Sequence, residues 1–409
     1  MNLTSPILRI AFIMTHLSHG SPGSFVRVQE IAKSLSEIGI DSTILTPYNE
    51  DVKNIHEPKL ELIPNLMAKL GMSSFAYKTA KKLSSTKITS KLFLSDKSIS
   101  RMISLTRNGM RKVLRNKKFD ILHAVQPISA LACAPLAREF GIPMVTDLHN
   151  IWSEEVTLQH DIDRENPLTV RIRALEQEII NGSSALTLTS EEMKNYLLKN
   201  FNVPQNVLLT ILPPAGPKIS PPPFDSKENN VVFAGLVDPA DHVDLFAKSL
   251  VHVKSRASFY ISNRGELLAE IKKITNQEKQ AQVNYKWFNM REDALNLLKK
   301  SRIGVLTERN DITRQLGPPL KIFDYMACGL PVVANDIGGW TEMISREKIG
   351  ILTKDDPIDF ANAIDLLLSD LDLWKMMATN AIKLNMQSYN WPLNVKKNLE
   401  PLYVKLLKH

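Results

Sequence analysis

Residues 318–334 read PPLKIFDYMACGLPVVA, a stretch that predicts a tight loop, a short helix and a buried strand in succession. Gly317 and the prolines after it interrupt the preceding structure, and Gly329 ends the helical run. The apolar run that follows is typical of a strand in a parallel sheet. A helix that begins at a tight loop offers free backbone N–H groups and a positive dipole end to an anion.

Two side chains of this helix indicate which kind of ligand would bind there. Lys321 adds a full positive charge at the start of the helix. Asp324 follows three residues later on the same helical face, where its carboxylate can accept two hydrogen bonds from a vicinal diol such as a ribose. We therefore expect an anion and a sugar diol to bind beside one another here.

Short β-rich runs alternate with helical patterns on both sides of this stretch, as in parallel sheets wrapped by helices. The stretch 212–223 contains six prolines and predicts an extended connector between two such sheets. The predicted strands span residues 9–14, 41–45, 121–124, 144–147, 185–188, 231–234, 258–262, 303–306 and 331–334.

The chain of 409 residues is long enough for two domains. We expect an N-terminal Rossmann-like domain over residues 1–212, with a basic helical insert at 65–118, and a second Rossmann-like domain over residues 228–385. Residues 213–227 are expected to form a Pro-rich linker, and the apolar spacing in residues 386–409 predicts a buried amphipathic helix.

Composition excludes several classes of protein. Two cysteines are too few for a disulfide framework or a thiolate metal site, which favours a reducing, cytoplasmic location. No apolar run approaches 18 residues, so no transmembrane helix is expected. The first apolar run, residues 8–14, lacks a basic n-region and a small-residue cleavage site, so no cleaved leader is expected either. No zinc spacing, Walker loop or G-x-S-x-G motif is present, and no metal site is predicted.

The positive charge of the chain is concentrated in residues 65–118, which hold fourteen Lys or Arg against one acid, Asp96. Apolar residues interleave with these charges, a pattern that suits peripheral contact with an anionic membrane surface such as the inner face of the cell membrane. A solvated helical face explains the pattern equally well. Nucleic acid is not expected, because no nucleic-acid-reading motif accompanies the charge.

Residues 318–334 resemble the stretch PLK-x-F-E-Y-M-A-C-G-x-P-V-V-A of family 4 glycosyltransferases. Residues 119–124 (FDILHA) and 141–149 (GIPMVTDLH) are similar to the D-x-I-H-A and G-I-P-x-V-x-D-x-H segments of that family, and residues 9–47 resemble its first βαβ unit. The resemblance implies the GT-B fold, with two facing Rossmann-like doubly wound parallel-sheet domains, a central cleft and a C-terminal helix that returns to the N-terminal domain.

The resemblance also implies a function: retaining transfer of a sugar from a nucleotide diphosphate sugar to a hydroxyl acceptor, without cofactor or metal. His149 would support the reacting sugar. Apart from the resemblance, the basic segment suggests a lipid-linked or cell-envelope glycan as the acceptor. Glu154 and Glu155, read as loop residues, would contact the acceptor, and a solvated pair of loop residues explains them equally well. The residues that would bind the donor are Lys321, Asp324, Gly317, Gly20, Gly23, Gly235 and Arg264.

The chain departs from the family pattern at two donor-binding cations. Leu236 stands where the family has an arginine, and Asp241 stands where it has a lysine. His242 and Arg264 are candidates to supply the missing charge. An alternative function follows from these departures, namely a catalytically degenerate GT-B protein that binds a glycan, a lipid or a partner enzyme.

Overall fold

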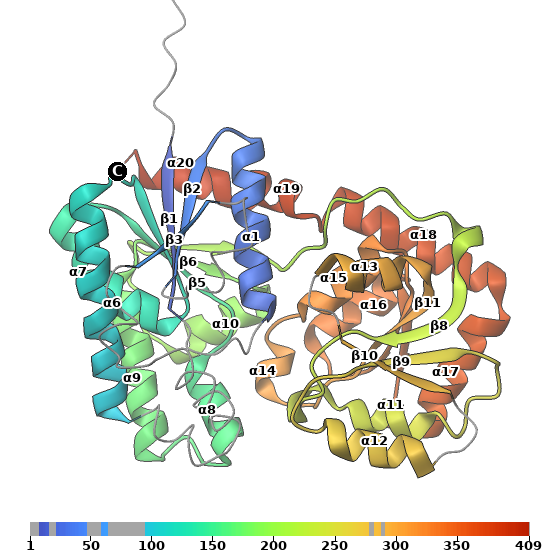
Figure 1. Cartoon of the computed structure of the whole chain (residues 1–409). Helices are drawn as coiled ribbons and strands as arrows, with labels where there is room; N and C mark the ends of the chain where they lie inside the picture. Colours follow the sequence, from blue (N-terminus) through green and yellow to red (C-terminus); the bar gives the residue numbers. More distant parts are fainter. Residues whose placement is uncertain are drawn as a thin grey trace, which may run out of the picture. The chain divides into compact units, whose positions relative to one another are not determined.

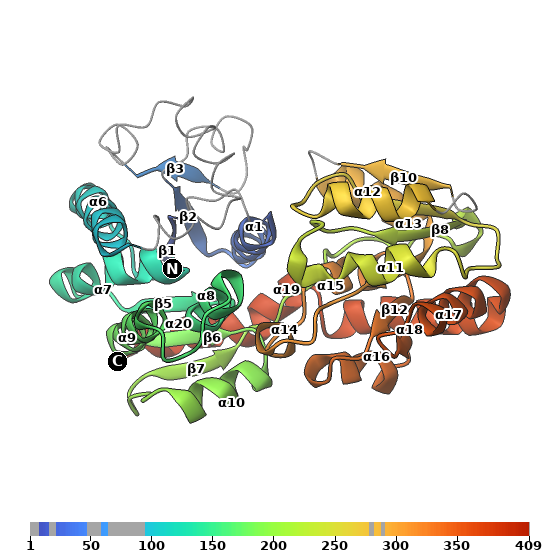
Figure 2. The ribbon, with the colours of Figure 1, turned by 90° about the horizontal axis from the view of Figure 1, so that it is seen from below.

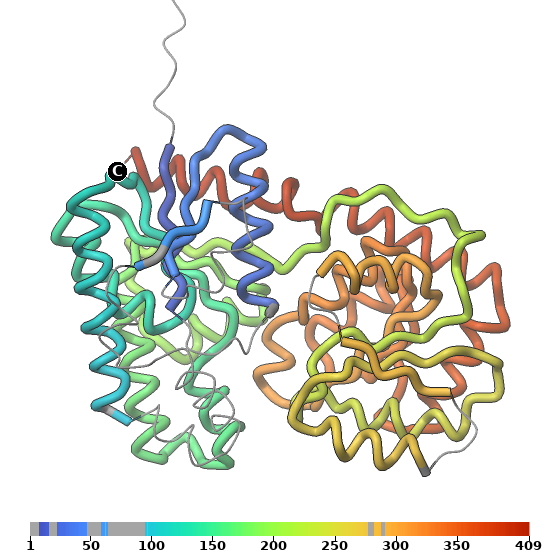
Figure 3. Tube along the Cα trace, in the orientation of Figure 1, coloured from blue at the N-terminus to red at the C-terminus, as the bar shows by residue number. Residues whose placement is uncertain are grey.

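The computed structural model describes residues 8–15, 22–46, 59–63, 95–277, 282–287 and 291–408. The chain divides into two compact units, which are residues 1–212 with 395–409 (unit 1) and residues 213–394 (unit 2). It passes from one unit to the other after Leu212 and again after Asn394 (Figures 1 and 3). Each unit has its own parallel sheet flanked by helices, so the expected class of two Rossmann-like α/β domains is confirmed.

The described part of unit 1 contains a seven-stranded parallel sheet in the order β3-β2-β1-β4-β5-β6-β7. This order reverses direction between β1 and β4, which is where ligands approach an open α/β sheet. The elements are β1 (Arg9–Met14), α1 (Pro22–Glu37), β2 (Asp41–Thr46), β3 (Leu60–Leu62), α6 (Asp96–Asn116), β4 (Ile121–Val125), α7 (Pro127–Phe140), β5 (Met144–Leu148), α8 (Trp152–His160), α9 (Pro167–Gly182), β6 (Ala185–Leu188), α10 (Glu191–Asn200), β7 (Leu208–Ile211), the π-helix η4 (Val395–Leu399) and α20 (Glu400–Leu406).

Helices α6 and α9 each pack against α7 on one face of this sheet, and α1 lies on the other face (Figure 2). Helix α6 carries part of the basic insert. Its apolar residues Ile99, Met110 and Val113 are buried, so they pack into unit 1 rather than facing outward. Residues 65–94 of the insert lie outside the described residues.

The C-terminal segment belongs to unit 1 only from Val395 onward. Leu399, Leu402 and Tyr403 are buried there, and the Tyr403 hydroxyl lies 2.6 Å from Nδ1 of His123 in β4. Residues 386–394, expected to begin the returning helix, lie in unit 2.

Unit 2 also contains residues 213–227, which the sequence predicted to be a linker. Gly216 forms a parallel bridge with Asn390, and a Cβ atom at Gly216 would lie 2.4 Å from the carbonyl oxygen of Phe323. The proline-rich segment is therefore bonded to residues 386–394. Position 216 requires glycine, because a side chain there would clash with the backbone of Phe323.

The described part of unit 2 contains a six-stranded parallel sheet in the order β10-β9-β8-β11-β12-β13. Alternate residues of β8 face two cores: Val231 and Phe233 pack with α11 and α17, whereas Val232 packs with α13, α15 and α16. The elements are η1 (Phe224–Ser226), β8 (Glu228–Phe233), η2 (Pro239–Asp241), α11 (Val243–Ser249), β9 (Ser258–Ser262), α12 (Leu268–Gln277), β10 (Val283–Lys286), α13 (Arg291–Lys300), β11 (Ser301–Leu306), α14 (Ile312–Gln315), α15 (Leu320–Ala327), β12 (Val332–Asn335), η3 (Gly339–Thr341), α16 (Glu342–Arg346), β13 (Gly350–Thr353), α17 (Pro357–Ser369), α18 (Leu371–Gln387) and α19 (Trp391–Asn394).

A buried carboxyl group joins α8 to α9. Glu176 of α9 accepts a hydrogen bond of 2.6 Å from the backbone N–H of Trp152, the first residue of α8. Burial raises the pKa of Glu176 from its ordinary value of 4.5 to about 7, and this hydrogen bond only partly opposes the rise. The folded chain therefore binds a proton at Glu176 more tightly than the unfolded chain does.

We predict that this proton makes unit 1 less stable as the pH rises. The stabilising contribution is fully present below the unfolded pKa and is lost as the pH rises through about 7, so the free energy of unfolding should fall by about 3 kcal/mol between pH 4.5 and pH 7.5. Urea denaturation at several pH values would measure the fall, which Glu176→Gln should remove. Glu178→Gln, at an exposed position of the same helix, should keep it.

Candidate active site

The ammonium group of Lys321 is buried in unit 2, at the first turn of α15. Its Nζ lies 2.5 Å from Oδ1 of Asp241 and 3.3 Å from Oε1 of Glu308, and 4.7 Å from the centre of the Phe233 ring. Burial by itself lowers the pKa of Lys321, but the two carboxylates outweigh that effect and raise it above its ordinary value. The side chain is therefore a fixed positive charge, already paired inside the chain.

Glu308 follows β11 and is held at both its backbone and its side chain. Its N–H donates to Oδ1 of Asn335 at 2.9 Å, and its carbonyl accepts from Nδ2 of Asn335 at 2.8 Å. The carboxylate also lies 3.3 Å from Nε of Arg314. Burial raises the pKa of Glu308, and the charges of Lys321 and Arg314 oppose the rise.

Asp241 is positioned by bonds between two strand-end loops. The Thr307 hydroxyl donates to the carbonyl of Asp241 at 2.7 Å, and the N–H of Arg309 donates to the carbonyl of Ala240 at 2.9 Å. Gly235 approaches closely, since a Cβ there would lie 3.3 Å from Nζ of Lys321. The position where the family has a lysine thus supplies a carboxylate that pairs with Lys321.

Asp324 lies on α15 with Lys321, but its own partner is Arg291. Its Oδ1 accepts a hydrogen bond of 2.5 Å from Arg291, and the side chain is 18% exposed. Burial raises the pKa of Asp324, while Arg291 opposes the rise. A ribose that binds Asp324 would have to share this carboxylate with Arg291.

Arg264 and His242 each have other partners. The guanidinium of Arg264 lies 4.7 Å from the centre of the Trp287 ring, and Gly265 beside it has φ 142 and packs against the backbone of Val237. The ring of His242 lies between two carboxylates, 2.9 Å from Asp244 and 2.6 Å from Asp355.

Three further glycines were predicted to bind the donor, and two of them lie in the described part of the chain. Gly317 lies in the loop between α14 and α15, and Gly23 lies in the first turn of α1. Gly20 lies outside the described residues.

In unit 1, His149 follows β5, and both of its ring nitrogens have partners. Nε2 lies 2.8 Å from Oδ2 of Asp147, and Nδ1 lies 3.1 Å from the hydroxyl of Ser24. Asp147 is buried and also receives two hydrogen bonds from Arg27, at 2.9 and 3.0 Å, and one from Thr187 at 2.7 Å. Burial raises the pKa of Asp147, but Arg27 and His149 outweigh this and hold it well below its ordinary value.

Glu154 and Glu155 lie in helix α8 and not on a loop. Acids in a first helical turn complement the helix dipole, which explains why the segment is helical. Glu154 is buried, accepts a hydrogen bond from the Tyr196 hydroxyl and lies 3.1 Å from Arg164. Glu155 accepts from Asn150 at 2.6 Å.

Sequence reasoning did not select Arg27, Asp147 or Glu308. Two of them carried a readable signal: Asp147 is an acid inside an otherwise apolar strand pattern, and Glu308 comes just after a buried strand. Arg27 lies in an ordinary helical pattern, and its role depends on a carboxylate 120 residues away.

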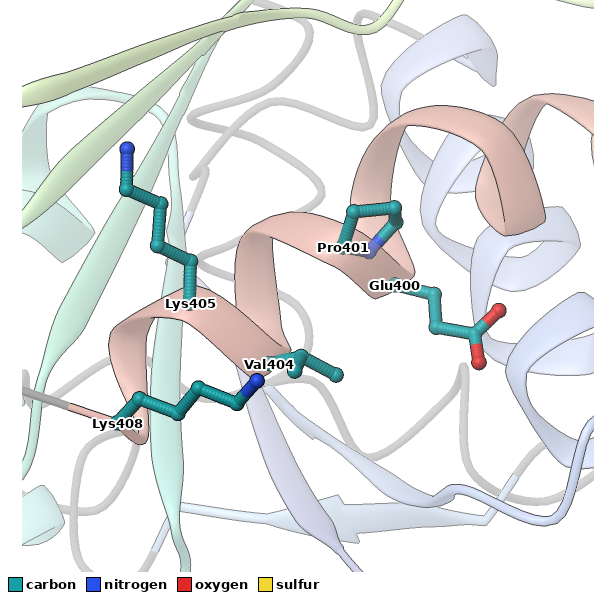
Figure 4. A pocket seen from close by; sticks show the side chains of 5 residues that line it. All are labelled: Glu400, Pro401, Val404, Lys405 and Lys408. Carbon is teal, nitrogen blue, oxygen red and sulfur yellow. The ribbon is translucent and has the colours of Figure 1, made fainter.

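A shallow hollow on the outer side of α20 contains none of these residues. It measures about 500 Å³ and is lined by Glu400, Pro401, Val404, Lys405 and Lys408 (Figure 4).

Comparison with known proteins matches both units. The sequence model of Glycosyltransferase Family 4 matches residues 23–214, and that of Glycosyl transferases group 1 matches residues 228–370. A D-inositol 3-phosphate glycosyltransferase from Paenarthrobacter aurescens (strain TC1) is 22% identical over 312 residues, which cover 69% of this chain and 72% of that protein.

Solved structures share the fold over almost the whole chain. Sucrose-phosphate synthase from Thermosynechococcus elongatus has a TM-score of 0.75 at 16% identity, covering 98% of this chain and 99% of its own. HepE from Anabaena, solved with UDP and glucose, has a TM-score of 0.69 at 13% identity, covering 97% of this chain and 100% of its own.

The burial of Lys321 predicts that its removal destabilises unit 2. Lys321→Met would leave Asp241 and Glu308 buried without their shared cation and should lower the free energy of unfolding by about 3 kcal/mol. Adding Asp241→Asn should recover about 1 kcal/mol or more, because one of the uncompensated charges is then absent. Chemical denaturation would measure both values. Lys375→Met, at an exposed position of α18, should change stability by less than about 0.5 kcal/mol, and an equal loss there would contradict the assignment.

Proposed function

Because the two sequence models together match residues 23–214 and 228–370, the chain belongs to the family 4 glycosyltransferases, and we propose that it transfers a sugar from a nucleotide diphosphate sugar to a hydroxyl acceptor with retention at the anomeric carbon. The observation that carries the proposal is the fixed ammonium of Lys321 at the start of α15. A cation at a helix start is suited to the negative charge of a leaving diphosphate.

The proposed donor site consists mainly of unit 2 residues, with Gly20 and Gly23 of unit 1 as further candidates. Lys321, with Arg314 nearby, would stabilise the charge that develops on the diphosphate as its bond to the anomeric carbon breaks. Asp324 would accept hydrogen bonds from the ribose. No metal ion takes part in this proposal, since protein cations would meet the diphosphate charge.

The proposed acceptor presents a hydroxyl group to unit 1, where His149 would support the reacting sugar. The name of the relative from Paenarthrobacter aurescens states D-inositol 3-phosphate as its substrate, which supports a hydroxyl-rich acceptor for this chain. The UDP and glucose bound to HepE support a nucleotide sugar as donor. The proposal includes a lipid-linked or cell-envelope glycan as the acceptor.

In this proposal Asp241 competes with the donor for Lys321. The carboxylate lies 2.5 Å from the ammonium that the diphosphate must reach, so an incoming phosphate competes with Asp241 for Lys321. We predict that Asp241→Asn tightens the binding of a nucleoside diphosphate about tenfold or more, because one charge-assisted contact becomes available and one repulsion disappears. Calorimetric titration with UDP and with GDP, in buffer containing EDTA, would measure the change.

The matched control for this titration is Asp365→Asn. It removes the same charge from α17, where Asp365 accepts hydrogen bonds from the N–H groups of Lys254 and Ser255, and it should leave nucleotide affinity unchanged. If the wild-type chain binds neither nucleotide and Asp241→Asn does not create binding, the donor-site proposal fails.

Contact with a membrane is proposed for the solvent face of α6 and the residues that follow it. In the described part of the chain, none of the helices combines the length and apolar character needed to cross a bilayer. The apolar side of α6 is buried against unit 1, so this contact would be electrostatic and would involve no insertion. The exposed basic side chains are Lys97, Arg101, Lys112, Arg115, Lys117 and Lys118, of which Lys117 is paired with Glu61.

We predict that the chain co-sediments with vesicles that contain anionic lipid and is released by salt. Each of these cations contributes about 1 kcal/mol near such a surface. Replacing Lys112, Arg115 and Lys118 with glutamine should weaken binding by at least about tenfold. The same change at Lys354, Lys375 and Lys383 of unit 2 is the control, and equal pelleting with neutral vesicles would count against the proposal.

A further inference from the structure

The geometry around His149 points to a residue that controls its ring. We propose that Arg27 is a positioning residue, which holds His149 in one orientation and one tautomer through the carboxylate of Asp147. This inference rests on the proposed function, in which His149 supports the reacting sugar, but the arrangement of the ring can be tested separately.

The first step in the argument is the fork of hydrogen bonds between Arg27 and Asp147. Nε of Arg27 donates to Oδ2 at 2.9 Å and Nη2 donates to Oδ1 at 3.0 Å, and the two side chains are 5% and 1% exposed. Because the fork is bidentate, it fixes the plane of the carboxylate as well as its position. Oδ2, which the fork holds, is also the atom that contacts Nε2 of His149.

The second step is that this carboxylate dictates the tautomer of His149. An ionised carboxylate has no proton to donate, so Nε2 of His149 must donate to Asp147. In the neutral ring Nδ1 is then an acceptor, and the Ser24 hydroxyl must donate to it. Nε2 of Gln126 donates to the oxygen of Ser24 at 3.2 Å, so this second contact does not compete for the hydroxyl proton of Ser24.

The third step is that only an arginine satisfies all the acceptors at this point. Nη2 of Arg27 also donates to the carbonyl of Leu212 at 2.7 Å, so this nitrogen donates both to Asp147 and to the backbone. Leu212 is the last residue of unit 1 before the chain enters unit 2. A lysine would keep the charge but cannot present this planar arrangement of donors.

Without the guanidinium, the buried charge of Asp147 would depend on Thr187 and on His149 itself. A buried carboxylate without a cation is unfavourable. Asp147 would then either take up a proton, and so cease to be a pure acceptor for Nε2, or draw a proton onto His149. In both cases the ring would leave the tautomer that the intact network holds.

The experiment compares the wild-type chain with Arg27→Met, Arg27→Lys and a matched control, Arg173→Met. Arg173 lies in the same unit, where its guanidinium donates to the backbone carbonyl of Asn200 at 2.5 Å and lies 4.8 Å from the centre of the Phe201 ring, away from the Asp147 and His149 network. Histidines would be labelled with ¹⁵N, and the signal of His149 would be assigned with His149→Gln. Donor turnover and UDP or GDP affinity would be measured on the same samples.

We expect Arg27→Met to shift the ring ¹⁵N signals of His149 and to lower kcat on the order of 100-fold, since a catalytic histidine in the wrong tautomer loses at least that much. Nucleotide affinity should stay within about twofold, because the donor site lies mainly in unit 2. Arg27→Lys should give a smaller effect in the same direction, and it carries the test if Arg27→Met does not fold. Arg173→Met should match the wild type in both readouts.

The two ideas fail in different ways. Unchanged ¹⁵N signals of His149 in folded Arg27→Lys and Arg27→Met would overturn the positioning role, whatever the turnover. A wild-type chain that transfers and hydrolyses no sugar, with His149 signals that do respond to Arg27, would overturn the proposed function and leave the role of Arg27 standing.

Discussion

The buried ammonium of Lys321 holds together the part of unit 2 from which its proposed chemistry follows. The two carboxylates that contact it come from separate loops, Asp241 after β8 and Glu308 after β11, and Lys321 itself begins α15. A buried ion is stable only while its partners remain in place. The pairing therefore couples three chain segments, of which the one with Asp241 lies 80 residues before Lys321, and a change in any one of them affects the other two.

Unit 1 also contains a buried ion that is compensated by an opposite charge inside the chain. There the buried ion is a carboxylate, Asp147, and the cation that compensates it is Arg27. In each unit the buried pair lies at the carboxyl ends of parallel strands, and a candidate functional group depends on it. In the proposed mechanism the pairing of Lys321 would limit which anions can reach the ammonium, whereas the pairing of Asp147 would set the direction in which the His149 ring donates. Charge compensation inside the chain would then contribute to the specificity of both proposed sites.

The sequence predicted the fold well where local patterns are strong. The strands at 9–14 and 258–262 were predicted with the bounds that the structure has. The strands β3, β7, β10 and β13 were missed, because they are only three or four residues long and mostly half-buried. Helix α8 was read as a loop, although Glu154 and Glu155 in its first turn are a signal for the start of a helix.

The candidate site could be predicted only in part, for a related reason. Lys321 was identified from a contiguous motif, and Asp241 was recognised as a departure from the family pattern. That these two side chains pair with each other could not be read from the sequence, because they are 80 residues apart and meet only when the sheet is formed. Arg27 was missed for the same reason, since a helix pattern does not reveal which carboxylate a buried arginine pairs with in the folded chain.

The central claim is that unit 2 activates the diphosphate of a nucleotide sugar with Lys321. The most direct measurement is the release of nucleoside diphosphate from a panel of labelled nucleotide sugars, comparing the wild-type chain with the charge-balanced double variant Lys321→Met with Asp241→Asn. The account predicts release by the wild type from at least one donor, and a loss on the order of 100-fold or more in the double variant with its fold retained. Equal release by the two proteins, or none by the wild type, would contradict it.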